Sequence, residues 1–259
     1  MLMRNGLLLT LVFASVMLVE VHAYFNVTYL NTTVILGANG TAHVVEQLSI
    51  FVSNSSISSY SQDRAAINLT LSDWQKALGT TVLVQHIINP RSSVYGFTLL
   101  PGALKSINQL GGQATITMDY YAKNVTTVVN VAPRKFKYTL NDSVFNFEPT
   151  ASGQQLFSDT RLNIEIPSGS HVNTIFPLPD QPAQSGINGY KNDTYFSWYA
   201  SEPLAQFSFS YTVTESLQQE VVSYFTGLYT GYRLPIYFLV ALVIALFMIY
   251  VYVKVIVEK

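Results

Sequence analysis

One hydrophobic run close to the C-terminal end constrains the chain most. Residues 234–253 contain no charged side chain, and a bilayer hydrocarbon core of about 30 Å is crossed by roughly 20 apolar residues in an α-helix. A buried core helix is the alternative, but such helices rarely stay uncharged on every face over this length. The run therefore predicts a transmembrane helix, with the rest of the chain before it on one side of a membrane.

The N-terminal end predicts which side of the membrane that is. Arg4 precedes an apolar run over residues 7–18, and Ala23 ends a short segment that suits a cleavage site, which is the layout of a secretory signal peptide. An uncleaved anchor is the alternative. We expect residues 1–23 to be removed and residues 254–259 to form a short cytoplasmic tail, so that the protein is a single-pass cell-membrane protein with an extracytoplasmic N-terminal domain.

Composition excludes several classes of protein. Only 11% of the residues are charged and 13% are aromatic, so the extracytoplasmic part can bury enough surface to fold. The net charge of −1 offers no basic footprint for nucleic acid. The chain has no cysteine, which excludes thiol chemistry, thiolate metal sites and disulfides. We therefore expect no cofactor and no nucleic-acid partner.

Glycosylation motifs are dense in the exported part. Chance would give about three Asn-x-Ser/Thr triplets from the asparagines present, and the chain has eight, each an N-glycosylation acceptor in an exported protein. The acceptor residues are Asn26, Asn31, Asn39, Asn54, Asn68, Asn124, Asn141 and Asn192. Dense motifs, no cysteine and few charges together favour an archaeal cell-surface glycoprotein.

The first two strands are predicted from alternation and a turn. Phe25, Val27 and Tyr29 alternate with polar residues, so we expect them on the inner face of a strand. Asn39-Gly40 suits a hairpin turn. A second strand follows, with Ala42, Val44, Glu46, Leu48 and Ile50 on one face. Both of its faces are partly apolar, which favours a central strand, and Glu46 is either an edge charge or a paired one.

A loop and a short helix are predicted next. Residues 53–61 are rich in serine and are typical of a loop. Ser72 is the predicted N-cap of a helix that has Gln75 in the capping-box position and ends at Gly79.

Many short strands follow, with turns at intervals of about a dozen residues. The predicted strands cover residues 82–84, 94–100, 115–120, 128–131, 136–140, 144–147, 161–166, 195–199 and 207–213. In the strand at 115–120 we expect Ile116, Met118 and Tyr120 to point inward, and in the strand at 161–166 Leu162, Ile164 and Ile166 share one side. This pattern is typical of an all-β fold. We expect residues 24–214 to form an antiparallel two-sheet sandwich, in one lobe or two.

The segment before the apolar run has a different pattern. Residues 215–233 carry apolar side chains at three- and four-residue steps, which favours an amphipathic juxtamembrane helix, although its glycines also suit a simple spacer. Tyr224, Phe225, Tyr229 and Tyr232 suit the membrane interface. Within the span, Ala241 and Ala245 are four residues apart and would let a second helix approach closely.

Motifs for catalysis are absent from the sequence. His43, His86 and His171 are widely spaced, without the pairing typical of metal sites, and there is no nucleophile elbow, phosphate loop or dinucleotide fingerprint. Residues 134–137 hold a basic cluster that suits either lipid headgroups or a partner, or else a solvated strand face. We expect no catalytic, metal or cofactor residues, and a protein that is not an enzyme.

Several segments resemble one known family. Residues 96–104, 107–112, 115–121, 145–150 and 160–167, with the closing segments 195–198 and 207–211, are similar in order to the luminal N-terminal domain of the ribophorin I family. That family is a non-catalytic subunit of the oligosaccharyltransferase. The resemblance implies a scaffold beside a multi-spanning glycosyltransferase and carries over no catalytic residue. The chain departs from the family after residue 253, where only six residues follow.

Two classes of function therefore stand side by side. The first is an accessory or scaffold subunit of a membrane complex, most concretely an archaeal oligosaccharyltransferase for protein N-glycosylation, with its catalytic subunit and membrane lipid as partners. The second is a cell-surface glycoprotein with a structural, anchoring or adhesive role, whose partner is a surface layer. A general substrate-binding protein is a weaker third option, since the sequence offers no convergent polar set.

Overall fold

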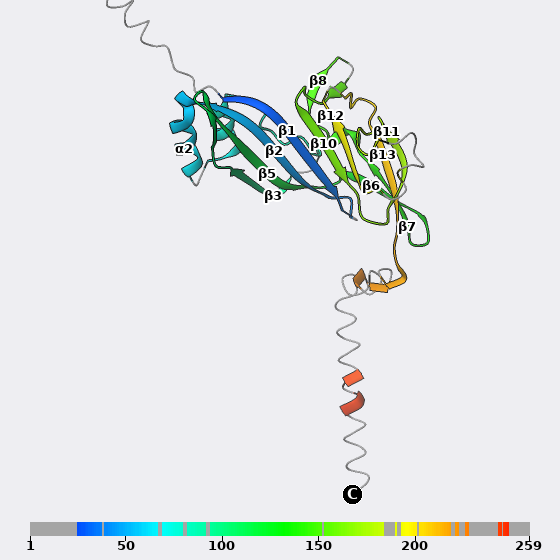
Figure 1. Cartoon of the computed structure of the whole chain (residues 1–259). Helices are drawn as coiled ribbons and strands as arrows, with labels where there is room; N and C mark the ends of the chain where they lie inside the picture. The colour runs from blue at the N-terminus through cyan, green and yellow to red at the C-terminus, as the bar shows by residue number, and fades with distance from the viewer. Residues whose placement is uncertain are drawn as a thin grey trace, which may run out of the picture.

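The computed structural model describes most of the region between the two hydrophobic ends (Figure 1). The described residues are 25–37, 39–66, 69–79, 82–91, 94–151, 153–183, 190, 193–200, 202–218, 221–222, 226–227, 243–244 and 246–248. The predicted signal peptide lies outside them. So do most of the predicted span and all six residues predicted for the membrane interface and helix packing, Tyr224, Phe225, Tyr229, Tyr232, Ala241 and Ala245. In the part of the chain that is described, no helix is both long and apolar enough to cross a membrane.

The described elements are mostly strands. In chain order they are β1 (Phe25–Leu36), β2 (Ala42–Ser53), η1 (Asn54–Ser56), α2 (Ile57–Ala65), α3 (Leu71–Leu78), β3 (Tyr95–Pro101), β4 (Lys105–Asn108), β5 (Gly111–Ala122), β6 (Thr126–Ala132), β7 (Lys135–Leu140), η2 (Asp142–Val144), β8 (Glu148–Thr150), β9 (Gly153–Gln155), β10 (Thr160–Glu165), β11 (His171–Phe176), β12 (Tyr195–Tyr199) and β13 (Ser208–Thr214). This content confirms the predicted all-β class.

The strands form one large and two smaller sheets. The seven-stranded sheet has the order β12-β10-β1-β2-β5-β3, with β4 also paired to β5; a four-stranded sheet has the order β11-β13-β7-β6, and β8 pairs with β9. The prediction of a wholly antiparallel fold is wrong at one place, because β10 runs parallel to β1. β6 to β9 lie between β5 and β10 in the chain and belong to the smaller sheets. β10 is therefore not joined to a neighbouring strand by a tight hairpin turn, which would require antiparallel pairing.

The inner face of the large sheet is covered at two ends. The four-stranded sheet packs on the β10–β12 side, where the Phe209 ring lies 5.5 Å from the Phe196 ring. At the other end α2 and α3 contribute Tyr60 and Trp74, whose rings are 5.8 Å apart, and α2 lies beside the ends of the long strands in Figure 1. One continuous apolar core therefore joins the two sheets and the helices.

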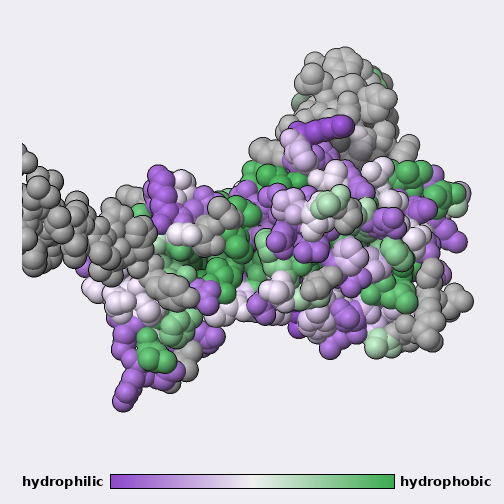
Figure 2. Space-filling model, turned by 90° about the horizontal axis from the view of Figure 1, so that it is seen from above, coloured by the Kyte–Doolittle hydropathy of each residue, from purple (hydrophilic) through white to green (hydrophobic). Residues whose placement is uncertain are grey.

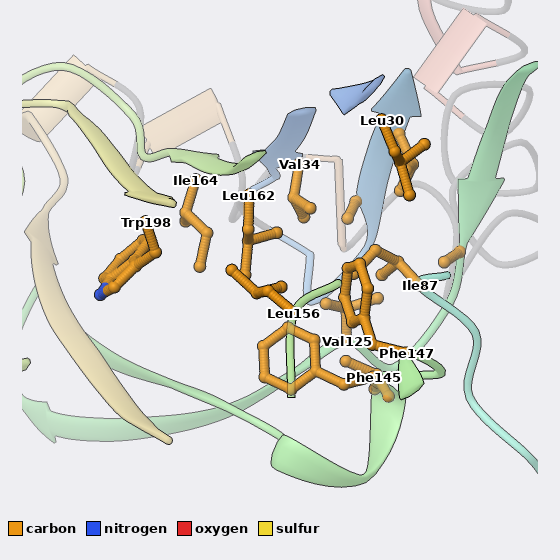
Figure 3. Close-up of a cluster of buried hydrophobic side chains, with 14 of the residues drawn as sticks. Leu30, Val34, Ile87, Val125, Phe145, Phe147, Leu156, Leu162, Ile164 and Trp198 are labelled. Atoms are coloured by element: carbon orange, nitrogen blue, oxygen red, sulfur yellow. The ribbon is translucent and has the colours of Figure 1, made fainter. Parts of the chain in front are cut away.

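Between these two ends the core is filled from the connecting segments. Figure 3 shows Leu30, Leu162 and Trp198 of the large sheet pointing into the interior from one side. Phe145 and Phe147 approach them from the other side, and all five residues are buried. The predicted strand at residues 144–147 is instead the end of η2 followed by an isolated bridge between Ile87 and Phe145. The prediction of a strand at residues 82–84 is also wrong, since these residues lie in the connection between α3 and β3.

Three local predictions about the first half of the chain need correction. Tyr29 is on the outer face, since the pairing of β1 with β2 shifts register between Val27 and Tyr29 and Leu30 takes the buried position. The serine-rich segment 53–61 is largely helical, as η1 and α2. The N-cap of α3 is Thr70, whose hydroxyl accepts a hydrogen bond from the Asp73 amide, so the predicted cap Ser72 lies inside the helix.

Candidate functional site

The outer face of the large sheet carries many polar side chains because its central strands alternate. In β2 the residues Val44, Glu46 and Leu48 are buried, and the intervening side chains face away from the core. The same alternation holds in β5, where Ile116 and Met118 are buried. The predicted inward residues of β5 are confirmed. In β2 the residues that were predicted to share one face are buried together, and the period of two leaves many polar side chains on the opposite side of both strands.

Strand register brings five outer-face residues into one row across five strands. Asn31 of β1 lies opposite Arg161 of β10 on one side and Gln47 of β2 on the other. Gln47 lies opposite Thr117 of β5, which lies opposite Leu100 of β3. The row thus runs across the sheet and offers a guanidinium, two amides, a hydroxyl and an apolar side chain in sequence.

A second, shorter row lies beside the first and completes a hollow. Tyr29, Ser49 and Thr115 are cross-strand partners. Together with Pro101 and Gly102 the two rows line an open hollow of about 650 Å³. We call these residues the outer-face groove. It continues into a smaller hollow of about 320 Å³ that shares Ser49, Gly102 and Thr115 and adds Lys105 and Gln113.

Gly102 closes one wall of the groove against β5. Its amide donates to the Thr115 carbonyl at 2.8 Å, and its carbonyl accepts from the Tyr60 hydroxyl at 2.9 Å. A Cβ at position 102 would lie 2.7 Å from the Thr115 oxygen, a contact that real Cβ atoms do not make. Glycine at this position therefore allows the wall to approach the sheet.

Arg161 is held firmly at one end of the groove. Its Nη2 donates to Ser197 Oγ at 3.1 Å and to Gln181 Oε1 at 3.4 Å, and its guanidinium carbon lies 5.0 Å from the centre of the Tyr199 ring. Among the described residues its buried Nε has no hydrogen-bond partner. The guanidinium is thus oriented in advance at this end of the groove.

Asn31 is also fixed by its neighbours. Its Oδ1 accepts a hydrogen bond of 2.8 Å from Nδ2 of the buried Asn163, and the Asn163 Oδ1 in turn accepts from Ser197 Oγ at 2.8 Å. Asn163 also donates to the Thr32 carbonyl and the Thr33 hydroxyl, each at 3.3 Å. This network holds the junction of β1, β10 and β12 in register beneath the groove.

The groove is suited to binding rather than to proton transfer. None of the described residues that line it is a carboxylate or a histidine, so it presents no candidate general acid or base. Amides, hydroxyls and one guanidinium can instead exchange hydrogen bonds with an extended polar chain. Leu100 and Tyr29 add apolar contact area at the margins.

A second polar cluster lies on the opposite, buried face. Glu46 Oε1 accepts from the His86 amide at 2.8 Å and from the Tyr120 hydroxyl, and Glu46 Oε2 lies 2.5 Å from His86 Nδ1. Burial, with the charge of Glu46 next in importance, raises the pKa of Tyr120 well above its usual value. All three side chains are buried and the His86 ring stacks on Phe147, so this cluster is structural and a substrate cannot reach it.

A third cluster lies on the outer face of the large sheet, close to the turn that connects β1 and β2. His43 Nε2 lies 2.8 Å from Asp119 Oδ1, and the His43 ring stacks on Tyr121 at 4.7 Å. Tyr121 stacks in turn on Tyr95, over which Lys123 Nζ lies 5.0 Å from the ring centre. Within the described ranges no group of three His, Asp or Glu side chains could hold a metal ion.

The predicted glycosylation residues occupy different environments. Asn26, Asn39, Asn54 and Asn124 are exposed, whereas Asn31 and Asn141 are half-buried. Asn68 and Asn192 lie outside the described residues. Asn31 is the one described acceptor residue that lines the groove. A glycan attached at Asn31 would fill the space above the rows.

The groove itself was not predicted from the sequence. Its residues are ordinary polar side chains on the outer side of alternating strands, and only strand register places them in line. A partial signal was present in the alternation of residues 115–120, which predicted the outward direction of Thr115 and Thr117. The sequence does not decide whether Glu46 is an edge charge or a paired one. In the structure it is paired with His86, which is 40 residues away in the chain.

The fold and the groove define an all-β protein with an open, largely polar groove on the outer face of its larger sheet. Figure 2 shows one face of this molecule, on which apolar side chains gather in patches separated by polar surface. In the comparisons with known proteins, no family model and no curated protein matches the chain.

Proposed function

We propose that the protein is a non-catalytic, membrane-anchored accessory subunit whose outer-face groove holds an extended polypeptide segment beside a membrane enzyme. The most concrete enzyme is an archaeal oligosaccharyltransferase, and the segment would then be its acceptor chain. The observation that carries the proposal is the row Arg161, Asn31, Gln47, Thr117 and Leu100, which crosses five strands in direct register.

The chemistry of the row suits a polypeptide. Peptide groups need both donors and acceptors, and amide side chains such as those of Asn31 and Gln47 supply both. The oriented guanidinium of Arg161 can donate to a carbonyl or carboxylate. The resemblance of the strand segments to the ribophorin I family, and the uncharged run at residues 234–253, support a position next to a membrane glycosyltransferase.

Site-directed cross-linking tests the groove. Because the chain has no cysteine, Gln47→Cys creates a single thiol that can carry a photoactivatable cross-linker in native membranes. Thr139→Cys, an exposed position on β7 of the other sheet, is the matched control. We expect position 47 to capture secreted polypeptides or the catalytic subunit, identified by mass spectrometry, several-fold more often than position 139. Equal capture at both positions would refute the proposal.

A second function is favoured by a separate observation. Four of the described acceptor asparagines are exposed, as a glycan-shielded cell-surface glycoprotein with a structural or adhesive role requires. Glycopeptide mass spectrometry distinguishes the two functions. A groove that binds polypeptide needs Asn31 unmodified, even if Asn26 and Asn39 carry glycans. A glycan at Asn31 would block the groove and favour the surface glycoprotein.

A further inference from the structure

The β6–β7 hairpin of the smaller sheet ends beside the last strand of the fold. The Glu215 amide donates to the Arg134 carbonyl at 2.8 Å, and Thr214, the last residue of β13, is the register partner of Lys135. In Figure 1 the tip of this hairpin lies at the end of the molecule where β13 finishes. The hairpin tip is therefore tied to the point where the chain leaves the fold and continues toward the uncharged run at residues 234–253.

One face of this hairpin is both apolar and basic. Val129 is the register partner of Lys137, and the inward positions of β7 are taken by Phe136 and Tyr138, which pack against the core. Val129 and Val131 are each 54% exposed, and Lys135 is exposed as well. Two solvent-facing valines and two lysines thus share the outward side of the hairpin near its tip.

The charges around the tip are predominantly positive. Arg134, Lys135 and Lys137 lie within four residues of one another, and Glu215 is the acidic residue next to them. Basic side chains close to a membrane surface are attracted to anionic headgroups, and apolar side chains between them enter the headgroup boundary. The hairpin tip has both components, and it lies beside the point where the chain leaves the fold.

We propose that the tip of the β6–β7 hairpin docks on the anionic lipid surface of the membrane that anchors the chain. This inference rests on the membrane-anchored part of the proposed function. The contact adds a second attachment point, which would fix the orientation of the two sheets, and so of the outer-face groove, relative to the bilayer. β6 is also an edge strand, but lysines beside an edge disfavour pairing with another strand.

Fluorescence quenching of the full chain in lipid nanodiscs tests the docking. Val129→Cys carries an environment-sensitive fluorophore, and the lipids carry a headgroup quencher. Leu110→Cys is the control, an exposed position between β4 and β5 near the helical end of the large sheet. In anionic discs we expect strong quenching at position 129 and little at position 110. At 1 M salt, where the Debye length is only about 3 Å, quenching at position 129 should fall roughly threefold or more.

Charge reversal of the two lysines tests the lipid contact, and extraction of native membranes tests the membrane anchor separately. The double variant Lys135→Glu, Lys137→Glu should reduce the quenching at position 129, and replacing the anionic lipid by neutral lipid should have the same effect. The discs hold only this chain, so the quenching cannot come from a strand of a partner protein. Equal quenching at positions 129 and 110, or quenching at position 129 that does not depend on the charge of the lipids, would overturn the docking. Alkaline carbonate extraction of native membranes reports on the anchor alone: release of the chain would contradict the membrane-anchored function, whereas an anchored chain with an unquenched position 129 contradicts only the lipid contact.

Discussion

At the scale of single residues, the Glu46 carboxylate joins three segments inside the core. It accepts hydrogen bonds from the His86 amide and the Tyr120 hydroxyl, and it lies 2.5 Å from His86 Nδ1. The Tyr120 hydroxyl also accepts from the Ile87 amide at 3.2 Å. The cluster therefore attaches the segment after α3 to the middle of β2 and β5. A buried carboxylate is tolerated here because hydrogen-bond donors surround it.

Truncation of this carboxylate should be strongly destabilising. Glu46→Ala leaves the donors of His86 and Tyr120 buried without their acceptor, and breaking such a buried pair costs roughly 3–5 kcal/mol. We expect a loss of this size in the free energy of unfolding, measured by urea denaturation of the full chain in mild detergent. Glu148→Ala, at an exposed position, is the control and should change the value by no more than about 0.5 kcal/mol. Similar losses for the two variants would contradict the structural role of the cluster.

At the scale of elements, short-range hydrogen bonds decide where the helices begin. The α3 helix starts with a capping box in which Thr70 and Asp73 satisfy each other's backbone amides. The hydrogen bonds from Thr70 to the Asp73 carboxylate lower the pKa of Asp73. Gly79 ends the helix in the left-handed conformation with φ of 61°, and this predicted stop is confirmed.

Mutation distinguishes the observed N-cap of α3, Thr70, from the predicted one, Ser72. Thr70→Ala removes the acceptor for the Asp73 amide and should lower the free energy of unfolding by about 1 kcal/mol. Ser72→Ala removes an exposed hydroxyl within the helix, and alanine is the best helix former, so we expect almost no loss. Chemical denaturation of both variants provides the comparison. A larger loss for Ser72→Ala than for Thr70→Ala would place the cap at the residue that the sequence suggested.

At the scale of the whole molecule, the two sheets share one core. Phe209 of the smaller sheet lies 5.5 Å from Phe196 and 6.3 Å from Trp198 of the larger one, measured between ring centres. Trp198 Nε1 also donates to the Pro177 carbonyl at 3.0 Å, so the ring's one polar atom is satisfied inside the contact. Because the apolar cluster continues from this contact to Trp74 beside α2, the sheets should unfold together.

Loss of the ring at position 209 tests this coupling. Phe209→Ala opens a cavity between the sheets and should cost roughly 3–5 kcal/mol. The chain has two tryptophans, so Trp74→Phe and Trp198→Phe each leave a single fluorescent probe. The remaining probe is Trp198 in the contact between the sheets or Trp74 in the contact between the helices. We expect the two probes to report the same urea midpoint, both in the Phe209→Ala background and without it. Midpoints that differ between the probes would show two independently unfolding lobes.

Alternation predicted most of the strands but not how they are joined. The inward positions of residues 115–120, and the shared faces of residues 42–50 and 161–166, follow from a period of two and agree with the burial of these side chains. The bulge in β1 escaped prediction, since a register shift depends on the partner strand β2. The helical state of residues 54–65 was also missed, because Tyr60 is held by packing on Phe25 and Trp74 rather than by local propensity. The groove could not be predicted at all from local pattern.

By itself the sequence determined that the fold is built of strands and which side chains share a face within most of them. Both follow from the spacing of apolar side chains along a short stretch of chain. Tertiary structure alone decided that β10 lies parallel to β1, that Glu46 meets His86, and that Arg161 stands in line with Asn31. Arg161 and Asn31 are 130 positions apart in the chain, and their meeting depends on how β10 inserts beside β1 after the smaller sheet has been built. Contacts of this kind are selected by the packing of the whole core, for which no local pattern codes.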